Sequence, residues 1–155
     1  MLNSTTFEER LNKNWKWCKM YFDRKIKEFK INGWSISMDN KKTSLGTTDY
    51  NKKRVTISKH FLRGITCNEK KMRNTILHEI AHVLTPGHQH GKKWKSVALK
   101  IGCDGKICGE MDLPDPKYIV TCKNKCFTNS YYRKPKVENK ICPKCRNNAI
   151  LKIMK

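Results

Sequence analysis

The pentapeptide His78-Glu79-Ile80-Ala81-His82 constrains the fold of this chain more than any other segment. Its two histidines are four residues apart and therefore project from one side of a helix, one turn above the other. The flanking residues predict such a helix from an N-cap at Asn68 to about Leu84, and Pro86-Gly87 ends it. The apolar stripe of this helix comprises Met72, Ile76, Ile80 and Val83, with Leu77, Ala81 and Leu84 beside it.

The spacing of the two histidines suits one zinc ion. Glu79 is rotated by about 100° from His78 on the helix, so its carboxylate can accept a proton from an attacking water without ligating the metal. Zinc polarises a scissile carbonyl, and the same carboxylate can later deliver the proton to the leaving amine as general acid. The simpler interpretation, two solvent-facing histidines, is disfavoured because more histidines follow just downstream.

A catalytic zinc site with three protein ligands needs one more side chain, and His88 and His90 are both within reach. His88 has the spacing of a metzincin third ligand, but Thr85 stands where that pattern has glycine. Because Thr85 is β-branched and precedes Pro86, it favours extended backbone, and we disfavour His88. A helix that begins directly after His90 would press Trp94 onto the first helix and hold the His90 imidazole over the metal.

The rest of residues 1–113 predicts an α+β body. Large apolar residues between Phe7 and Phe29 recur at helical spacing, which predicts a long N-terminal helix. Three short, partly alternating stretches follow, and we expect a small three-stranded antiparallel sheet. The helical stripe comprises Phe7, Leu11, Trp15, Phe22, Ile26 and Phe29; the strands are Trp34–Met38, Ser44–Tyr50 and Arg54–Ser58; a last helix is expected from about Gly91 to Ile101.

A linker with two prolines, Leu113-Pro114-Asp115-Pro116, precedes a cysteine-rich tail, so we expect domains at residues 1–113 and 114–155. The tail holds two cysteine pairs at zinc-knuckle spacing, enough thiolates for one closed structural zinc site. Metal binding would supply the folding energy of so small a segment. Two disulfides are disfavoured because the N-terminus has no apolar run typical of a signal peptide. The pairs are Cys122 with Cys126 and Cys142 with Cys145.

The other four cysteines are Cys18, Cys67, Cys103 and Cys108. Cys103 and Cys108 lie near the end of the body and could extend a metal site, but we favour ordinary core or surface thiols for both. Met111 invites comparison with a Met-turn, although a single methionine more often serves packing.

The string His78-Glu79-x-x-His82, His90-Gly91-x-x-Trp94 and Ile101-Gly102 resembles the SprT-like zinc metallopeptidases, the family that includes Spartan. The resemblance implies that His90 is the third zinc ligand, since this family uses the histidine before the glycine. The order of elements is similar over nearly the whole chain, and many members carry a zinc ribbon after the protease domain. The resemblance also implies cleavage of proteins trapped on DNA.

Charge is the second argument for a nucleic-acid partner. The formal net charge is +21, and residues 118–155 hold ten of the 34 Lys and Arg but one of the 13 Asp and Glu. Such an excess attracts polyanions, although the lysine content could also reflect genome composition. Aromatic residues beside basic ones can stack on bases, or the aromatics can form the ribbon's own core. The candidate contacts are Tyr131, Tyr132, Arg133, Lys134 and Lys136, with Lys92 and Lys93 beside the predicted active site.

We therefore expect a zinc metalloendopeptidase with one catalytic and one structural Zn²⁺, acting on DNA-bound or DNA-crosslinked proteins, with single-stranded or distorted DNA as partner. One alternative is a non-catalytic zinc-containing nucleic-acid-binding protein, against which Glu79 argues because a structural metal has no use for that carboxylate. Another is a peptidase indifferent to DNA. No run of 18 apolar residues occurs, and we expect a monomer that is not membrane-bound or secreted but intracellular, in the cytoplasm or nucleus.

Overall fold

The computed structural model describes residues 6–107, 117–137, 141–147 and 149–153. The chain divides into two units, Met1–Leu113 and Pro114–Lys155, and each is described by itself. The predicted linker at residues 113–116, together with Cys108 and Met111, lies outside the described residues.

Helix α1 (Phe7–Glu28) is the predicted N-terminal helix. A capping box starts it: the Glu9 N–H donates to the Thr6 hydroxyl at 3.2 Å, and the Thr6 N–H donates to the Glu9 carboxylate at 2.7 Å. Phe7, the first residue of the predicted apolar stripe, is 63% exposed. Phe7 lies in the first turn, and its ring contacts the Arg10 guanidinium, 4.9 Å from the ring centroid.

Three strands, β1 (Ser35–Asp39), β2 (Gly46–Asp49) and β3 (Arg54–Ser58), form a sheet in the order β1-β3-β2. β2 and β3 are an antiparallel hairpin, but β1 and β3 are parallel, so the prediction of an antiparallel sheet was wrong for that pair. The most apolar strand, β3, takes the central position, where Val55 and Ile57 are fully buried. Because β3 forms an antiparallel hairpin with β2, it runs opposite to β2 and parallel to β1.

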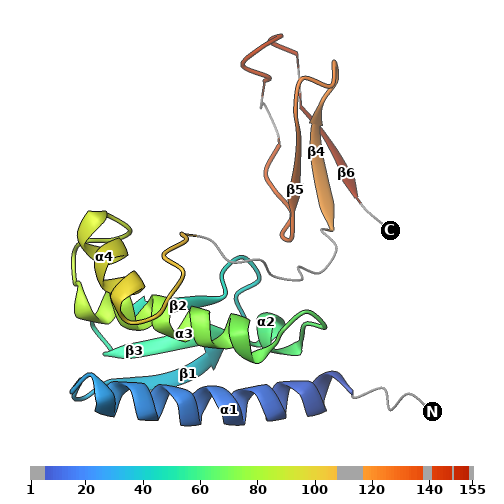
Figure 1. Cartoon of the computed structure of the whole chain (residues 1–155). Coiled ribbons are helices and arrows are strands. Elements are labelled where there is room, and N and C mark those ends of the chain that lie inside the picture. The colour runs from blue at the N-terminus through green and yellow to red at the C-terminus, as the bar shows by residue number, and fades with distance from the viewer. Residues whose placement is uncertain (1–5, 108–116, 138–140, 148, 154–155) are drawn as a thin grey trace. The chain divides into compact units, whose positions relative to one another are not determined.

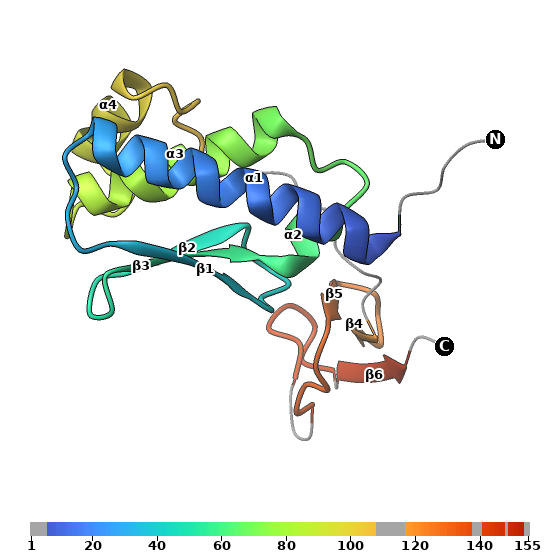
Figure 2. The same cartoon turned by 90° about the horizontal axis from the view of Figure 1, so that it is seen from below.

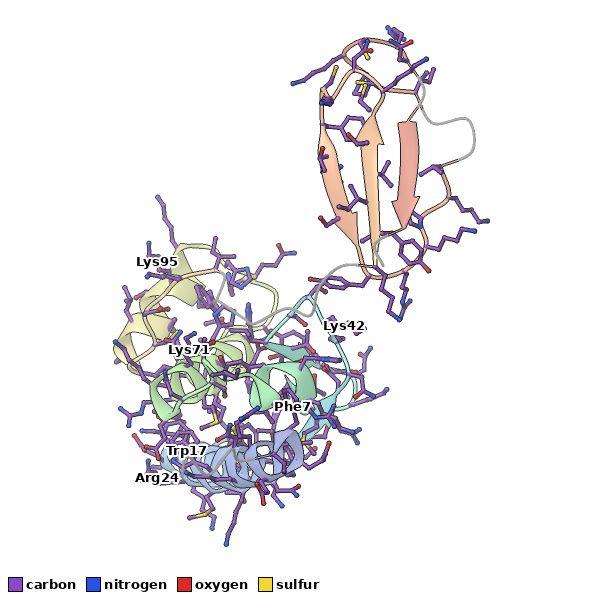
Figure 3. The ribbon with its side chains drawn as sticks, turned by 90° about the vertical axis from the view of Figure 1, so that its right-hand side faces the viewer. Phe7, Trp17, Arg24, Lys42, Lys71 and Lys95 are labelled. Carbon is purple, nitrogen blue, oxygen red and sulfur yellow. The ribbon has the colours of Figure 1, made fainter. Side chains whose placement is uncertain are left out.

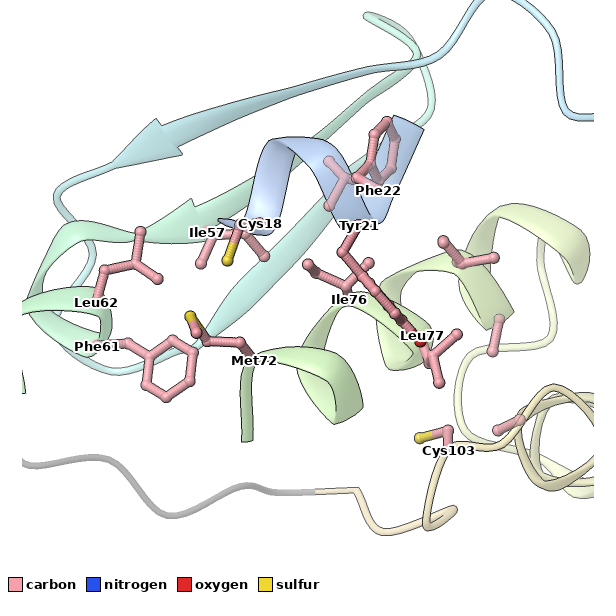
Figure 4. Packing of buried hydrophobic residues seen from close by; sticks show 14 of the residues in the cluster. Cys18, Tyr21, Phe22, Ile57, Phe61, Leu62, Met72, Ile76, Leu77 and Cys103 are labelled. Carbon is pink, nitrogen blue, oxygen red and sulfur yellow. The ribbon is translucent and has the colours of Figure 1, made fainter. Parts of the chain in front are cut away.

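Helices α1 and α3 (Glu69–Leu84) lie on the same side of this sheet (Figure 1 and Figure 2). The core lies between them and β3, and Figure 4 shows its side chains meeting there. The other face of the sheet is polar: the Thr56 hydroxyl donates to Asp39 at 2.7 Å and lies 2.7 Å from the Thr47 hydroxyl. The core comprises Leu11, Cys18, Tyr21, Phe22, Val55, Ile57, Phe61, Leu62, Met72, Ile76, Leu77, Ile80, Ala81, Trp94, Ala98 and Cys103.

A short helix, α2 (Lys59–Arg63), was not predicted from the sequence. The Ser58 hydroxyl caps it by accepting the Phe61 N–H at 3.4 Å, and the helix buries Phe61 and Leu62. Five residues are too few to display a helical period, which is why the pattern gave no signal. The last helix of this unit is α4 (Lys92–Lys100), close to its predicted bounds.

The second unit is a three-stranded antiparallel sheet of β4 (Tyr118–Cys122), β5 (Thr128–Tyr131) and β6 (Ala149–Ile153), in the order β5-β4-β6. The architecture of the whole chain is therefore α+β, as predicted. Within the described residues, no helix has both the length and the apolar character needed to cross a bilayer.

Candidate metal centres

Helix α3 carries the pentapeptide and begins where the sequence predicted. The Asn68 side chain accepts the Lys71 N–H at 2.9 Å, which satisfies one of the free donors of the first turn. At the other end, the buried Thr85 hydroxyl donates to the Ala81 carbonyl at 2.7 Å. The helix is thus held at both ends, with Glu79 buried and His78 and His82 half-buried along one side.

The structure brings His78, His82 and His90 together. The His90 Nε2 atom lies 3.0 Å from the Nε2 atom of His78 and 3.1 Å from that of His82. Two zinc–nitrogen bonds of about 2.0–2.1 Å at a tetrahedral angle separate their nitrogens by about 3.3 Å, so the spacing fits one zinc ion. Three imidazole nitrogens this close together can form few hydrogen bonds with one another, because each neutral ring carries a single N–H. A metal ion bound by all three explains why they converge.

The turn between α3 and α4 selects His90 rather than His88. The positive φ falls on Gly87 (79°) and Gln89 (41°), whereas Thr85 keeps a φ of −130°, outside the left-handed region. The chain therefore turns two residues later than the metzincin pattern requires, and His88 is exposed outside the histidine group.

Trp94 of α4 is fully buried and contacts all three imidazoles. Its ring centroid is 4.7 Å from that of His78, 5.3 Å from that of His82 and 4.7 Å from that of His90. A rigid indole against three rings restricts their rotation and so orients the nitrogens before any metal binds.

Burial keeps the imidazoles of His78 and His82 neutral. It lowers the pKa of His78 to about 4, and the neighbouring His90 acts in the same direction. Burial, followed by His78 and His90, likewise lowers the pKa of His82 to about 4. At neutral pH both rings are therefore unprotonated, the form in which histidine binds a metal.

Glu79 is 5% exposed, and its carboxylate lies against strand β2. The Thr48 hydroxyl donates to Glu79 Oε2 at 2.7 Å. Burial raises the pKa of Glu79 to about 7, while the Thr48 hydrogen bond and Lys41 act in the opposite direction. A carboxyl group with a pKa near neutrality can both accept and donate a proton at physiological pH.

Sequence reasoning missed several residues around the histidines. The Tyr50 hydroxyl donates to the His82 carbonyl at 2.8 Å, and the backbone of Lys106 hydrogen-bonds His78. Asn74 accepts the Asp104 N–H at 2.8 Å and so holds the segment that reaches His78. These contacts join residues about 30 positions apart, and no local spacing in the sequence indicates them.

A cavity of about 760 Å³ opens at the histidines. β2 and the residues before it form one wall, and the segment after α4 contributes Lys106 and Ile107. Glu79 and the three histidines reach the same cavity, so a polypeptide bound there would meet all four side chains.

The second unit brings together the four predicted cysteines. The sulfur atoms of Cys122, Cys126, Cys142 and Cys145 all lie within 4.8 Å of one another. Cys122 and Cys145 sulfurs are 3.2 Å apart, and the Asn124 N–H points at the Cys122 sulfur at 3.3 Å. Four thiols with a backbone donor suit a closed tetrahedral site, and none of the seven cysteines in the described residues forms a disulfide.

The remaining predicted residues belong to neither the cysteine group nor the histidine group. Cys18 and Cys103 are buried among core residues, as expected of ordinary thiols. In the tail, Tyr131 and Tyr132 are half-buried, whereas Arg133, Lys134 and Lys136 are exposed. Lys92 and Lys93 are exposed in the first turn of α4, which Gly91 separates from His90.

A helix-borne pair of histidines, a third histidine from the next turn and a buried carboxylate in an open cavity define a metallopeptidase. A family model described as the SprT-like family matches residues 11–113. The chain therefore belongs to the SprT-like family.

Two solved structures are similar to this chain. One is the metallopeptidase zymogen jannalysin of Methanocaldococcus jannaschii, with 18% identity and a TM-score of 0.48 over 56% of this chain and 83% of that one. The other is the metallopeptidase zymogen abylysin of Pyrococcus abyssi, with 14% identity and a TM-score of 0.41. The match covers 59% of this chain and 78% of that one. No curated protein matches the sequence.

Proposed function

We propose that this chain is a zinc-dependent endopeptidase that cleaves proteins bound or crosslinked to DNA. The observation that carries the proposal is the convergence of three imidazole nitrogens, with His90 Nε2 at 3.0 and 3.1 Å from those of His78 and His82, beside the buried carboxylate of Glu79. A purely structural metal site has no need for such a carboxylate, so the arrangement favours catalysis over the non-catalytic alternative.

Each residue then has a distinct task in peptide hydrolysis. His78, His82 and His90 would hold zinc, which when bound polarises the scissile carbonyl and acidifies the attacking water. Glu79 accepts the proton of that water and later donates it to the leaving amine. Trp94 keeps the imidazoles oriented, and the burial of Glu79 keeps its pKa close to the working pH.

The edge of β2 favours an extended polypeptide substrate. The Ser58 N–H donates to the Leu45 carbonyl at 2.8 Å, and the ladder continues with Gly46 opposite Ile57. Because hydrogen-bonded and non-hydrogen-bonded pairs alternate in an antiparallel ladder, the backbone groups of Gly46 and Thr48 point away from β3. They are free to pair with a peptide lying along the cavity, which would suit cleavage within a chain.

Charge supports the DNA part of the proposal. The net charge is +21, and basic side chains such as Arg24 on α1 and Lys95 on α4 point away from the core (Figure 3). Exposed Arg133, Lys134 and Lys136 follow two tyrosines in the tail, a composition suited to phosphates and bases of a single strand. DNA binding would deliver protein substrates to the cavity without a side-chain specificity pocket.

The test is cleavage of a DNA-binding protein by the zinc-loaded chain, with and without single-stranded DNA, followed on a gel that also reveals self-cleavage. We expect fragments only when DNA is present and only with Glu79 intact, so Glu79→Gln serves as the matched control. Full cleavage after nuclease treatment would indicate a peptidase indifferent to DNA. DNA binding without cleavage would support the non-catalytic alternative.

A second measurement addresses the DNA contacts alone. The affinity for a single-stranded oligonucleotide should fall steeply with salt, because Lys and Arg release counterions from the phosphates they contact. Replacing Arg133, Lys134 and Lys136 with Gln should weaken binding and reduce the salt dependence. Binding that does not respond to salt would contradict the DNA part of the proposal.

A further inference from the structure

Thr48 makes a contact that the catalytic scheme above does not use. Its hydroxyl lies 2.7 Å from Glu79 Oε2 and 3.2 Å from the Glu79 carbonyl oxygen. Thr48 pairs with Val55 of β3, and Val55 is fully buried on the face covered by the helices. The hydroxyl therefore faces α3 from the strand next to it, with a carboxylate as its shorter partner.

Gly46 completes the contact on the same face of β2. A Cβ atom at Gly46 would lie 3.0 Å from Glu79 Cγ and 3.1 Å from Glu79 Oε1, closer than nearly all real Cβ contacts. The Glu79 side chain thus lies against bare backbone at Gly46 and receives a hydrogen bond from Thr48 two residues along. Two residues of β2, Gly46 and Thr48, therefore fix the position of the Glu79 carboxylate.

The two carboxylate oxygens are consequently in different situations. A threonine hydroxyl has a single proton, and the shorter of its two contacts directs that proton to Oε2. Among the hydrogen bonds of the described residues, Oε1 receives none. Oε1 therefore keeps its lone pairs available for a proton from water.

We propose that Thr48 is a positioning residue for Glu79: its hydroxyl holds Oε2 so that Oε1 is presented for proton exchange. The proposal rests on the proposed peptidase function. The Thr48 hydroxyl contacts Glu79 and no metal ligand, and only the backbone of Thr48 faces the substrate in this scheme, so the effect of the hydroxyl passes through Glu79. Loss of the hydroxyl therefore lowers turnover and leaves metal and substrate binding in place.

A merely structural role for Thr48 makes a different prediction. The contact with the Glu79 carbonyl ties β2 to α3, and its loss alone would lower stability without a specific effect on turnover. Thr56→Val is the matched control, because it also removes a threonine hydroxyl with a 2.7 Å hydrogen bond, to Asp39 on the opposite face of the sheet.

The experiment compares Thr48→Val, Thr48→Ser and Thr56→Val with the wild type in steady-state cleavage of a fluorogenic peptide in the presence of saturating single-stranded DNA, together with zinc content and thermal unfolding. We expect Thr48→Val to lower kcat by about 10- to 100-fold, the usual effect of losing an outer-shell partner, with KM changed by less than about twofold. Zinc content should be unchanged, unfolding should resemble that of Thr56→Val, and Thr48→Ser should recover most of kcat.

Two results would overturn the proposal: a Thr48→Val protein with wild-type kcat, or a loss of kcat that Thr56→Val shares and serine does not repair. A crystal structure of zinc-loaded Thr48→Val gives a readout independent of turnover, in which we expect the Glu79 carboxylate displaced or in several conformers. An unmoved carboxylate also contradicts the proposal. If the wild type shows no cleavage that Glu79→Gln abolishes, the peptidase function itself has failed.

Discussion

Glu79 is the residue on which the chemistry of this site depends. Its carboxylate is buried on α3, and burial raises its pKa to about 7 despite the Thr48 hydrogen bond and Lys41, which lower it. Such a group changes protonation state within the range of physiological pH, unlike an exposed glutamate. The sequence motif predicts the role of Glu79, whereas its raised pKa arises only from burial in the folded protein.

The pH dependence of cleavage should report this pKa. Only ionised Glu79 accepts a proton, so kcat/KM should fall as the pH decreases below about 7, approaching about tenfold per pH unit. The measurement is kcat/KM from about pH 5 to about pH 9, with zinc content determined at each pH to exclude metal loss. A flat profile in protein that retains its zinc would contradict the assignment of Glu79 as base.

The choice between the two downstream histidines can be tested directly. His90→Asn should lose the zinc of the first unit, because the Nε2 atom of His90 lies 3.0–3.1 Å from the other two ligand nitrogens. His88→Asn, the matched control, should retain it since His88 is exposed outside the group. Elemental analysis after dialysis distinguishes the two variants, and zinc loss from His88→Asn alone would reverse the assignment.

At the scale of secondary-structure elements, α3 depends on its first turn. The Asn68 side chain accepts the Lys71 N–H at 2.9 Å, and Asn68→Ala removes this acceptor. We expect a loss of about 1 kcal/mol in the free energy of unfolding, with Asn68→Asp close to the wild type because it keeps an acceptor oxygen. Denaturant unfolding of the zinc-loaded protein measures both, and equal stability of all three would exclude a role for the cap.

Strand β2 has the opposite character to α3, since little in its own sequence reveals what it does. Gly46 and Asp49 are weak strand formers on either side of two threonines, and the hairpin to β3 places this segment at the edge of the sheet. From that position Thr48 reaches Glu79 and Tyr50 reaches the His82 carbonyl. The element thus supports the site through contacts that arise only after the sheet has packed against α3.

At the scale of the whole molecule, the two units differ in how they are stabilised. The first has a continuous hydrophobic core that includes Trp94 and Phe22. Among residues 117–137 and 141–147 of the second unit, the buried apolar side chains are Val120, Cys122 and Cys142, and two of these are candidate metal ligands. We therefore expect this small unit to depend on its metal for folding.

Removal of zinc from the second unit should therefore unfold that unit alone. Cys142→Ser removes one of the four converging thiols and should leave one zinc ion per chain, in the histidine site. The measurement is a ¹H–¹⁵N NMR spectrum, in which signals of residues 117–153 should collapse to unfolded positions while those of the first unit persist. A variant whose second unit stays folded without zinc would contradict metal-dependent folding.

The sequence alone predicts the metal-binding helix, its Asn68 cap and the two cysteine pairs, because each is encoded in spacings of a few residues along the chain. That helix carries His78, Glu79 and His82. The parallel pairing of β1 with β3, the short α2 and the contact of Thr48 with Glu79 could not be predicted from the sequence. They depend on which strand takes the buried centre of the sheet and on which surfaces then meet. Local backbone geometry determines the first group, whereas competition for burial among distant segments determines the second.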